Sequence, residues 1–176
     1  MRLQKLNMDD KREISFIENL YEESFPKNER RPKERMLNVY KDEPKFQILL
    51  AWSENNPVGF FNYWDLGTFI FVEHFAVCSK HRNKGYGSKI LNSIKSKVSK
   101  PIILEVELPI EEMAKRRIIF YEREGFTLWD KVNYNQPSYY NDGKSYPMKL
   151  MALGKLSENS DSQNIINLIH TIPYKH

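Results

Sequence analysis

Residues 75–91 read FAVCSKHRNKGYGSKIL, in which a β-rich run is followed by a basic loop with two glycines and then by an amphipathic helix. Glycine lets a ligand approach the backbone closely, and the first turn of a helix offers free N–H groups at the positive end of its dipole. The loop is not a P-loop and lacks the third glycine of GxGxxG. The pattern nevertheless predicts a turn that holds a phosphate or pyrophosphate, although two glycines at a turn can also be purely structural.

The basic residues of the chain gather around this loop. The net charge is only +4, yet residues 80–100 contain seven lysines and arginines and no acidic residue. Such a run favours an anionic ligand, and a solvated lysine face is the alternative interpretation. Nucleic acid is not the expected partner, because the basic side chains flank a glycine loop and do not alternate with stacking aromatics.

Length and composition exclude several classes of protein. The single cysteine, Cys78, cannot form an internal disulfide, and the four histidines have no partners at zinc-ligand spacing, so no metal is expected. The charged N-terminus and the absence of a long apolar run argue against a signal peptide and a membrane span, which makes the cytoplasm the expected location. The 176 residues predict one domain over residues 1–153 and an extension over 154–176 that carries a short docked helix.

On both sides of the loop, strands and helices alternate along the chain. Hydrophobic periodicity and turn residues predict helices over 10–24, 33–40, from Gly87 to Val98 and over 111–124, and strands over 3–6, 46–52, 58–64, 69–77, 102–108, 126–134 and 146–153. A meander followed by alternating strands and helices and a closing hairpin predicts a mixed α/β sheet.

Two motifs carry a resemblance to a known family. Residues 75–91 resemble the acetyl-coenzyme A signature of the GNAT superfamily of acyltransferases, in which a strand ending in valine leads into [R/Q]xxGx[G/A] and a helix. Residues 120–126, FYEREGF, resemble the FYxxxGF helix end of the same family and follow in the expected order. The resemblance covers about residues 1–153 and implies an α/β fold with a GNAT-type mixed, mostly antiparallel sheet of about seven strands and flanking helices.

The resemblance also implies a co-substrate and the residues that hold it. Acetyl-coenzyme A would lie with its pyrophosphate on the backbone of residues 82–88 and its pantetheine arm beside the strand at residues 75–77. The implied cofactor-binding residues are Phe75, Ala76, Val77, Arg82, Asn83, Lys84, Gly85, Tyr86, Gly87 and Ser88. Many relatives have an asparagine one or two turns before the tyrosine of FYxxxGF, but residues 113–117 read MAKRR here, so that contact lacks its residue.

Acetyl transfer to an amine requires a base, and Glu73 is the first candidate. Strand alternation places Glu73 on one face with Phe71 and Phe75, and His74 on the other. Desolvation among aromatic rings would make a carboxylate more basic, and a glutamate at this place is the base proposed for several relatives. The alternative is a solvated or salt-bridged acid.

Other candidates carry the remaining roles. Tyr121 would donate a proton or hydrogen bond to the leaving thiolate, as the resemblance implies, or it is a plain core tyrosine. Glu105 and Glu107 share a strand face and are rivals for the base, and Glu105 is a candidate for binding the substrate amine; an exposed polar face is the alternative. Cys78 has no neighbours that would activate it and is interpreted as a small buried hydrophobe.

The expectation for the acceptor-binding site depends on the loop over residues 25–35. This loop contains five basic and two acidic residues. In GNAT proteins the corresponding loop edges the acceptor site, so Arg30 and Arg31 would grip an anionic group of the acceptor, unless the loop is merely solvated. The aromatic-rich residues 134–140 would form another wall or an oligomer contact, which leaves a homodimer open.

Together these observations predict an N-acetyltransferase that moves an acetyl group from acetyl-coenzyme A to a primary amine of a small molecule or protein by direct attack. The alternative is a GNAT-like module that binds acyl-coenzyme A without turnover.

Overall fold

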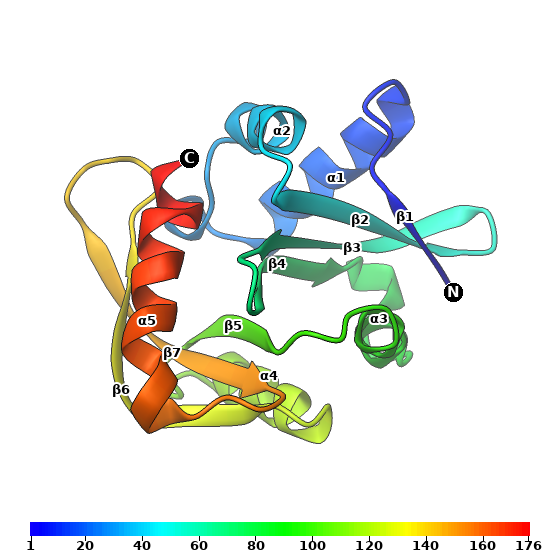
Figure 1. Cartoon of the computed structure of the whole chain (residues 1–176). Helices are drawn as coiled ribbons and strands as arrows, with labels where there is room; N and C mark the ends of the chain where they lie inside the picture. Colours follow the sequence, from blue (N-terminus) through cyan, green and yellow to red (C-terminus); the bar gives the residue numbers. More distant parts are fainter. The chain divides into compact units, whose positions relative to one another are not determined.

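The computed structural model describes residues 1–176 and contains a seven-stranded sheet flanked by five α-helices. The elements are β1 (Arg2–Lys5), α1 (Lys11–Ser24), η1 (Lys27–Glu29), α2 (Lys33–Asp42), β2 (Phe46–Ser53), β3 (Asn56–Asp65), β4 (Ile70–Val77), η2 (Ser79–His81), α3 (Tyr86–Lys95), β5 (Ile102–Glu107), α4 (Glu112–Arg123), β6 (Thr127–Pro137), β7 (Ser145–Leu153), α5 (Glu158–Thr171) and η3 (Pro173–Lys175) (Figure 1).

The strand order is β1-β2-β3-β4-β5-β7-β6. β4 pairs in parallel with β5 through Ile70 and Ile102, whereas β1–β2, β2–β3, β5–β7 and β6–β7 are antiparallel. This arrangement confirms the predicted mixed, mostly antiparallel sheet. None of the helices is both long and apolar enough to span a membrane.

Contacts divide the chain into two compact units, and β4 contributes to both. The first unit comprises residues 1–64 and 73–99. Within it, α1 and α2 contact each other and α2 packs against β2 (Figure 1). Asp10 caps α1 by accepting a hydrogen bond from the Arg12 N–H at 2.9 Å. A side-chain acceptor at this position satisfies one of the free N–H groups of the first turn, which is why the helix begins here.

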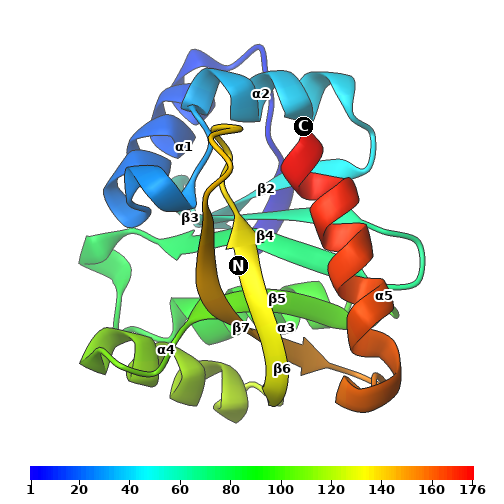
Figure 2. The same ribbon diagram turned by 90° about the vertical axis from the view of Figure 1, so that its left-hand side faces the viewer.

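The second unit comprises residues 65–72 and 100–176. In it, α4 packs against β5 and β6, and α5 packs along β6 (Figure 2). α5 is longer than the apolar run IINLIH indicated, because Ser157 caps its polar first turn. The Ser157 N–H donates to Asp161 at 2.7 Å, and its hydroxyl lies 3.5 Å from the Ser160 N–H.

Gly59 in β3 marks a close approach between backbones. A Cβ atom at this position would lie 2.5 Å from the carbonyl oxygen of Ala76 and 3.3 Å from Cα of Val77, both in β4. Only glycine fits at position 59, beside the residues of β4 that come shortly before the glycine loop.

We therefore expect Gly59→Ala to lower the free energy of unfolding by about 1–3 kcal/mol, the usual cost of overpacking. Denaturant unfolding measures the change. Gly143→Asn is the control, since Gly143 has φ +71° with open space around it and asparagine tolerates this backbone. A Gly59→Ala variant as stable as the control would contradict the packing account.

Candidate active site

The glycine loop contains two residues whose backbone has a positive φ. Asn83 has φ +59° and Gly85 has φ +75°, and α3 begins directly afterwards at Tyr86. Asparagine and glycine are the residues that adopt this region most readily. The sequence RNKGYG therefore folds as a compact loop that leads into the first turn of the helix.

No side chain caps the N-terminus of α3. The Lys89 N–H donates to the Gly85 carbonyl at 3.1 Å, and the N–H groups of the preceding turn lie ahead of the helical ladder. Residues 82–85 are exposed, while Ile90, Leu91 and Ile94 bury the opposite face of the helix. The free N–H groups and the helix dipole are thus presented at an accessible surface and suit an anion.

Basic side chains border this surface. Arg82 Nε donates to the Val77 carbonyl at 3.1 Å, Lys84 Nζ donates to the Lys80 carbonyl at 2.9 Å, and Lys89 Nζ lies 5.3 Å from the centre of the Tyr86 ring. These contacts hold the loop in shape and leave positive charge beside the helix N-terminus. The Tyr86 hydroxyl lies 3.2 Å from the Ser53 hydroxyl and ties the start of α3 to the end of β2.

The strand before the loop is partly open. Phe75 and Val77 are half-buried, and Ala76 is buried. Burial raises the pKa of the Cys78 thiol, so this residue stays protonated and is not an activated nucleophile. This agrees with its interpretation as a buried hydrophobe.

Glu73 and Arg31 form a buried ion pair in the first unit. Both side chains have no exposed surface, although the backbone of Glu73 retains some. The Arg31 guanidinium also lies over the rings of Phe46 and Trp64, at 5.8 and 5.9 Å from their centres. The expectation that Arg31 reaches toward an anionic acceptor is therefore wrong, because its charge is desolvated and engaged by Glu73.

Arg30 is also turned back onto the protein. Its Nε donates to the Phe25 carbonyl at 3.0 Å, its guanidinium lies 3.6 Å from the Glu22 carboxylate, and it stacks over the Tyr21 ring at 5.7 Å. Its side chain is 15% exposed. The loop between α1 and α2 is thus fastened to its own unit, and nothing in its geometry presents Arg30 as a grip for an anion.

Burial alternates along β4 between the half-buried Glu73 and the buried His74, yet the two side chains come close to each other. Its Nδ1 lies 3.8 Å from Glu73 Oε2, and its Nε2 is bonded to the Glu29 carbonyl at 3.0 Å. The His74 backbone N–H donates to the buried side chain of Asn62 at 2.5 Å. The only signal for Asn62 in the sequence was a polar residue inside an apolar strand.

Burial lowers the pKa of His74 to about 4, partly opposed by the negative charge of Glu73. In the unfolded chain a histidine titrates near pH 6.5, so on acidification the unfolded state binds a proton before the folded state does. We expect the free energy of unfolding to fall by up to about 3 kcal/mol between pH 6.5 and 4 for this reason.

Chemical denaturation across this pH range measures the effect. His74→Gln should flatten the pH dependence, while His81→Gln, at a half-buried position beside the glycine loop, should leave it unchanged. Equal slopes in the native protein and the His74 variant would show that other groups carry the acid sensitivity.

Tyr121 lies on α4 in the second unit. It is 7% exposed, and its ring contacts those of Phe120 and Phe126 at 5.2 and 5.4 Å between centroids. Burial raises the pKa of Tyr121 to about 12, with Arg117 acting against this shift. The phenol is therefore a neutral donor at neutral pH. Glu107, one of the rival bases, is instead paired with Arg117 near the surface.

Glu105, on β5 in the same unit, is held by two phenols. Its carboxylate accepts hydrogen bonds from the hydroxyls of Tyr134 and, at 2.7 Å, of Tyr174. Sequence reasoning missed Tyr174, which lies 69 residues away near the end of the chain. No group of three or more His, Cys, Asp or Glu residues is placed to hold a metal ion.

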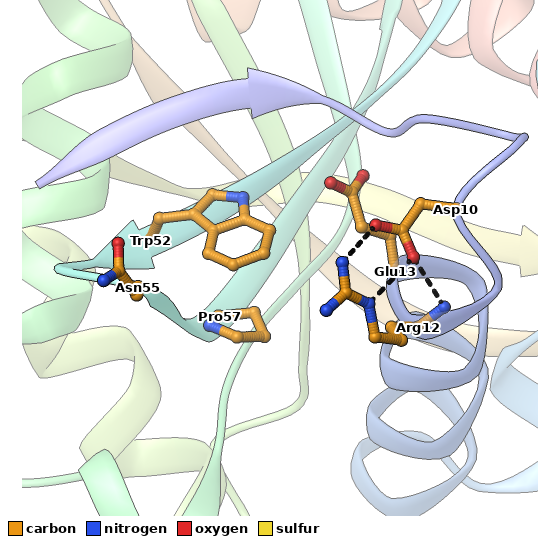
Figure 3. A pocket seen from close by; sticks show the side chains of 6 residues that line it. All are labelled: Asp10, Arg12, Glu13, Trp52, Asn55 and Pro57. Carbon is orange, nitrogen blue, oxygen red and sulfur yellow. Dashed lines mark hydrogen bonds and ion pairs between the residues drawn. The ribbon is translucent and has the colours of Figure 1, made fainter.

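A surface hollow of about 280 Å³ is lined by residues outside the glycine loop (Figure 3). Trp52, Asn55 and Pro57 from the β2–β3 hairpin line one side, and the start of α1 lines the other. Two of the polar side chains there, Arg12 and Asp10, form an ion pair with each other at 3.1 Å. The hollow shares no residue with the predicted site.

Comparisons with known proteins agree with this geometry. A family model described as "Acetyltransferase (GNAT) domain" matches residues 44–128. A comparison with curated protein sequences gave no significant match.

Solved structures provide the full-length comparison. A protein from Bacteroides thetaiotaomicron, assigned as an acetyltransferase from the GNAT family, is 42% identical, with a TM-score of 0.93 and coverage of 100% of this chain and 99% of its own. An aminoglycoside 6'-N-acetyltransferase complexed with coenzyme A is 16% identical, with a TM-score of 0.61 and coverage of 89% and 100%. The ribosomal-protein-S18-alanine N-acetyltransferase from Escherichia coli is 15% identical, with a TM-score of 0.58 and coverage of 90% and 97%, and like the preceding structure it shares the fold. Identity at the level of the Bacteroides protein over the whole length shows the family, and the chain therefore belongs to the GNAT superfamily of acetyltransferases.

Proposed function

We propose that this protein is an N-acetyltransferase that moves the acetyl group of acetyl-coenzyme A onto a primary amine by direct attack. The observation that carries the proposal is the uncapped N-terminus of α3 behind an exposed loop with two positive-φ residues. A structural neighbour with an N-acetyltransferase fold was solved with coenzyme A, which supports the choice of co-substrate.

The residues of the loop fit the pyrophosphate of coenzyme A. The backbone N–H groups of residues 85–88 would bind its oxygens, and Arg82, Lys84 and Lys89 would balance its charge. No acidic residue between positions 80 and 100 opposes this. The pantetheine arm would lie beside Phe75, Ala76 and Val77. The exposed part of this strand offers backbone groups for hydrogen bonds with the arm.

Glu73 is the proposed base. Its carboxylate is buried and paired with Arg31, which fixes its position in the first unit. Glu73→Gln tests the role, since it removes the negative charge and nearly preserves the shape. If the rate of transfer does not change in this variant, the base is Glu105 or water.

Tyr121 is the proposed partner of the leaving thiolate. An ordinary thiol titrates near pH 8.5, so a phenol with a pKa of about 12 would give up its proton at a cost of about 5 kcal/mol. Tyr121 therefore acts as a hydrogen-bond donor that stabilises the developing thiolate and does not fully transfer its proton.

We expect Tyr121→Phe to lower kcat by about ten- to a hundredfold, because a hydrogen bond to a charged atom contributes about 1.5–3 kcal/mol. The affinity for acetyl-coenzyme A should not change. Tyr140→Phe, at an exposed position of the same unit, is the control. Equal rates for the two variants would make Tyr121 a core residue.

The function is tested by incubating the protein with acetyl-coenzyme A and a panel of amines and measuring free-thiol release together with the mass of each acceptor. An acceptor heavier by one acetyl group, formed only with protein present, supports the proposal. Binding of acetyl-coenzyme A without transfer to any amine would instead support a binding module.

A further inference from the structure

β6 forms one edge of the seven-stranded sheet, and with 11 residues it is the longest strand of the protein. The strand at the opposite edge, β1, has only 4 residues. An edge strand presents N–H and carbonyl groups that have no neighbour in the sheet, and a strand of another molecule can add to them. Because a short strand offers few such groups, β6 is the edge of this sheet that requires protection.

The middle of β6 contains a bulge. Trp129 is paired with Leu150 of β7 and Tyr134 with Met148, so β6 has more residues than β7 between these two pairs. Extra residues in one strand interrupt the ladder of hydrogen bonds locally, and their backbone groups are left without partners in the neighbouring strand. The N–H groups of the bulge therefore need acceptors from another part of the chain.

Side chains of α5 bond to the backbone of β6 near both ends of the helix. At the start of α5, the Glu158 carboxylate accepts hydrogen bonds from the N–H groups of Lys131 and Val132, at 2.5 and 3.2 Å. In the last turn, the imidazole of His170 is hydrogen-bonded to the Asn135 backbone. α5 packs along β6 and thus supplies hydrogen-bond partners that a further strand would otherwise supply (Figure 2).

An apolar face holds α5 in this place. Ile165 and Ile169 lie between Glu158 and His170 in the sequence, and both are buried. Asn164, directly before Ile165, is exposed. Because the same helix carries the apolar contacts and the polar ones, loss of the apolar contacts would also withdraw Glu158 and His170 from β6.

We propose that α5 guards the β6 edge and prevents a second copy of this chain from adding to the sheet there. The second copy is the expected partner because it brings the same edge. Two β6 strands related by a two-fold axis pair antiparallel, and each then supplies acceptors for the N–H groups of the other. This role of the C-terminal extension is independent of acetyl transfer.

Amide hydrogen exchange in the full-length protein tests the polar contacts. Glu158→Ala should speed the exchange of the Lys131 and Val132 N–H groups by about ten- to a hundredfold, the factor expected for the loss of a hydrogen bond to a charged group. Glu158→Gln should speed it less, because its amide oxygen still accepts. Asp161→Asn is the matched control, since it removes a charge from the same turn of α5 and leaves Glu158 in place.

Sedimentation velocity over a wide range of protein concentration tests the guard itself. Ile165→Asp places a charge on the buried face and should release α5, so we expect species of at least twice the native mass. Asn164→Asp introduces the same charge at the exposed neighbouring position and should keep the native mass. Proline cannot donate to a β-ladder, so Asn135→Pro added to Ile165→Asp should restore the native mass.

An Ile165→Asp variant that keeps the native mass although the amides of α5 exchange freely would overturn the proposal. Association that persists after Asn135→Pro is added would also overturn it, because the contact would then lie outside the β6 edge. Where Ile165→Asp does not fold, the double variant Glu158→Ala, His170→Ala removes both polar contacts and leaves the apolar face intact. The native mass for this double variant, or unchanged exchange of the Lys131 and Val132 amides in Glu158→Ala, would contradict the guard.

Discussion

Replacing Arg31 with methionine should lower the free energy of unfolding by about 3–5 kcal/mol, the largest stability effect that we expect from one substitution. Methionine retains an apolar stem beside Phe46 and Trp64 but removes the guanidinium, which leaves the Glu73 carboxylate buried without this partner. The cost is large because a carboxylate that has lost its water gains little from apolar surroundings.

Two further variants separate this effect from general damage. Arg30→Met removes the neighbouring arginine, whose pair with the 41% exposed Glu22 side chain is near the surface, and should cost less than about 1 kcal/mol. The double variant Arg31→Met, Glu73→Gln removes both charges and should regain much of the stability lost by Arg31→Met alone. Equal losses for the two arginines would show that the buried pair contributes nothing special.

Acetyl-coenzyme A should stabilise the folded protein by roughly 2.7 kcal/mol at a concentration of about 100 times its Kd, which corresponds to a rise in Tm of about 5–11 °C. The valine of Gly87→Val would stand beside the N–H groups at the start of α3 and should weaken binding by about a hundredfold or more. Two or more charge-assisted hydrogen bonds to the pyrophosphate would be lost.

The variant should still fold, because valine is no worse than glycine inside a helix. Thermal melting and calorimetric titration measure the two effects. Ser93→Ala, toward the other end of α3, is the control and should bind normally. Acetylated pantetheine, which lacks the pyrophosphate, should bind weakly to all three proteins; tight binding of this fragment would move the recognition away from the loop.

The order and type of the elements could be predicted from the sequence because each depends on local patterns. The apolar spacing of Ile90, Leu91 and Ile94 predicted the buried face of α3, and those residues are buried. Gly125, with φ +92°, ends α4 as its position after the apolar run indicated. The boundaries shifted by a few residues where capping side chains, such as Ser157, extended a helix beyond its apolar part.

The surroundings of the candidate residues could not be predicted, because they depend on contacts between residues far apart in the chain. Arg31 and Glu73 are 42 residues apart, and nothing local shows that a loop arginine is buried. The backbone of His74 donates to the side chain of Asn62, which lies 12 residues away in another strand. Tyr174 reaches Glu105 from the last turn of the chain. The periodicity of the sequence contains no information on any of these three contacts.

The measurement that bears most directly on the proposed activity is the stoichiometry of free thiol and acetylated amine formed from acetyl-coenzyme A. We predict that the native protein releases one thiol for each acetyl group found on an amine, at a rate well above hydrolysis, and that Gly87→Val abolishes both products together. Saturable binding of acetyl-coenzyme A with neither product formed from any amine of the panel would contradict the assignment as an acetyltransferase.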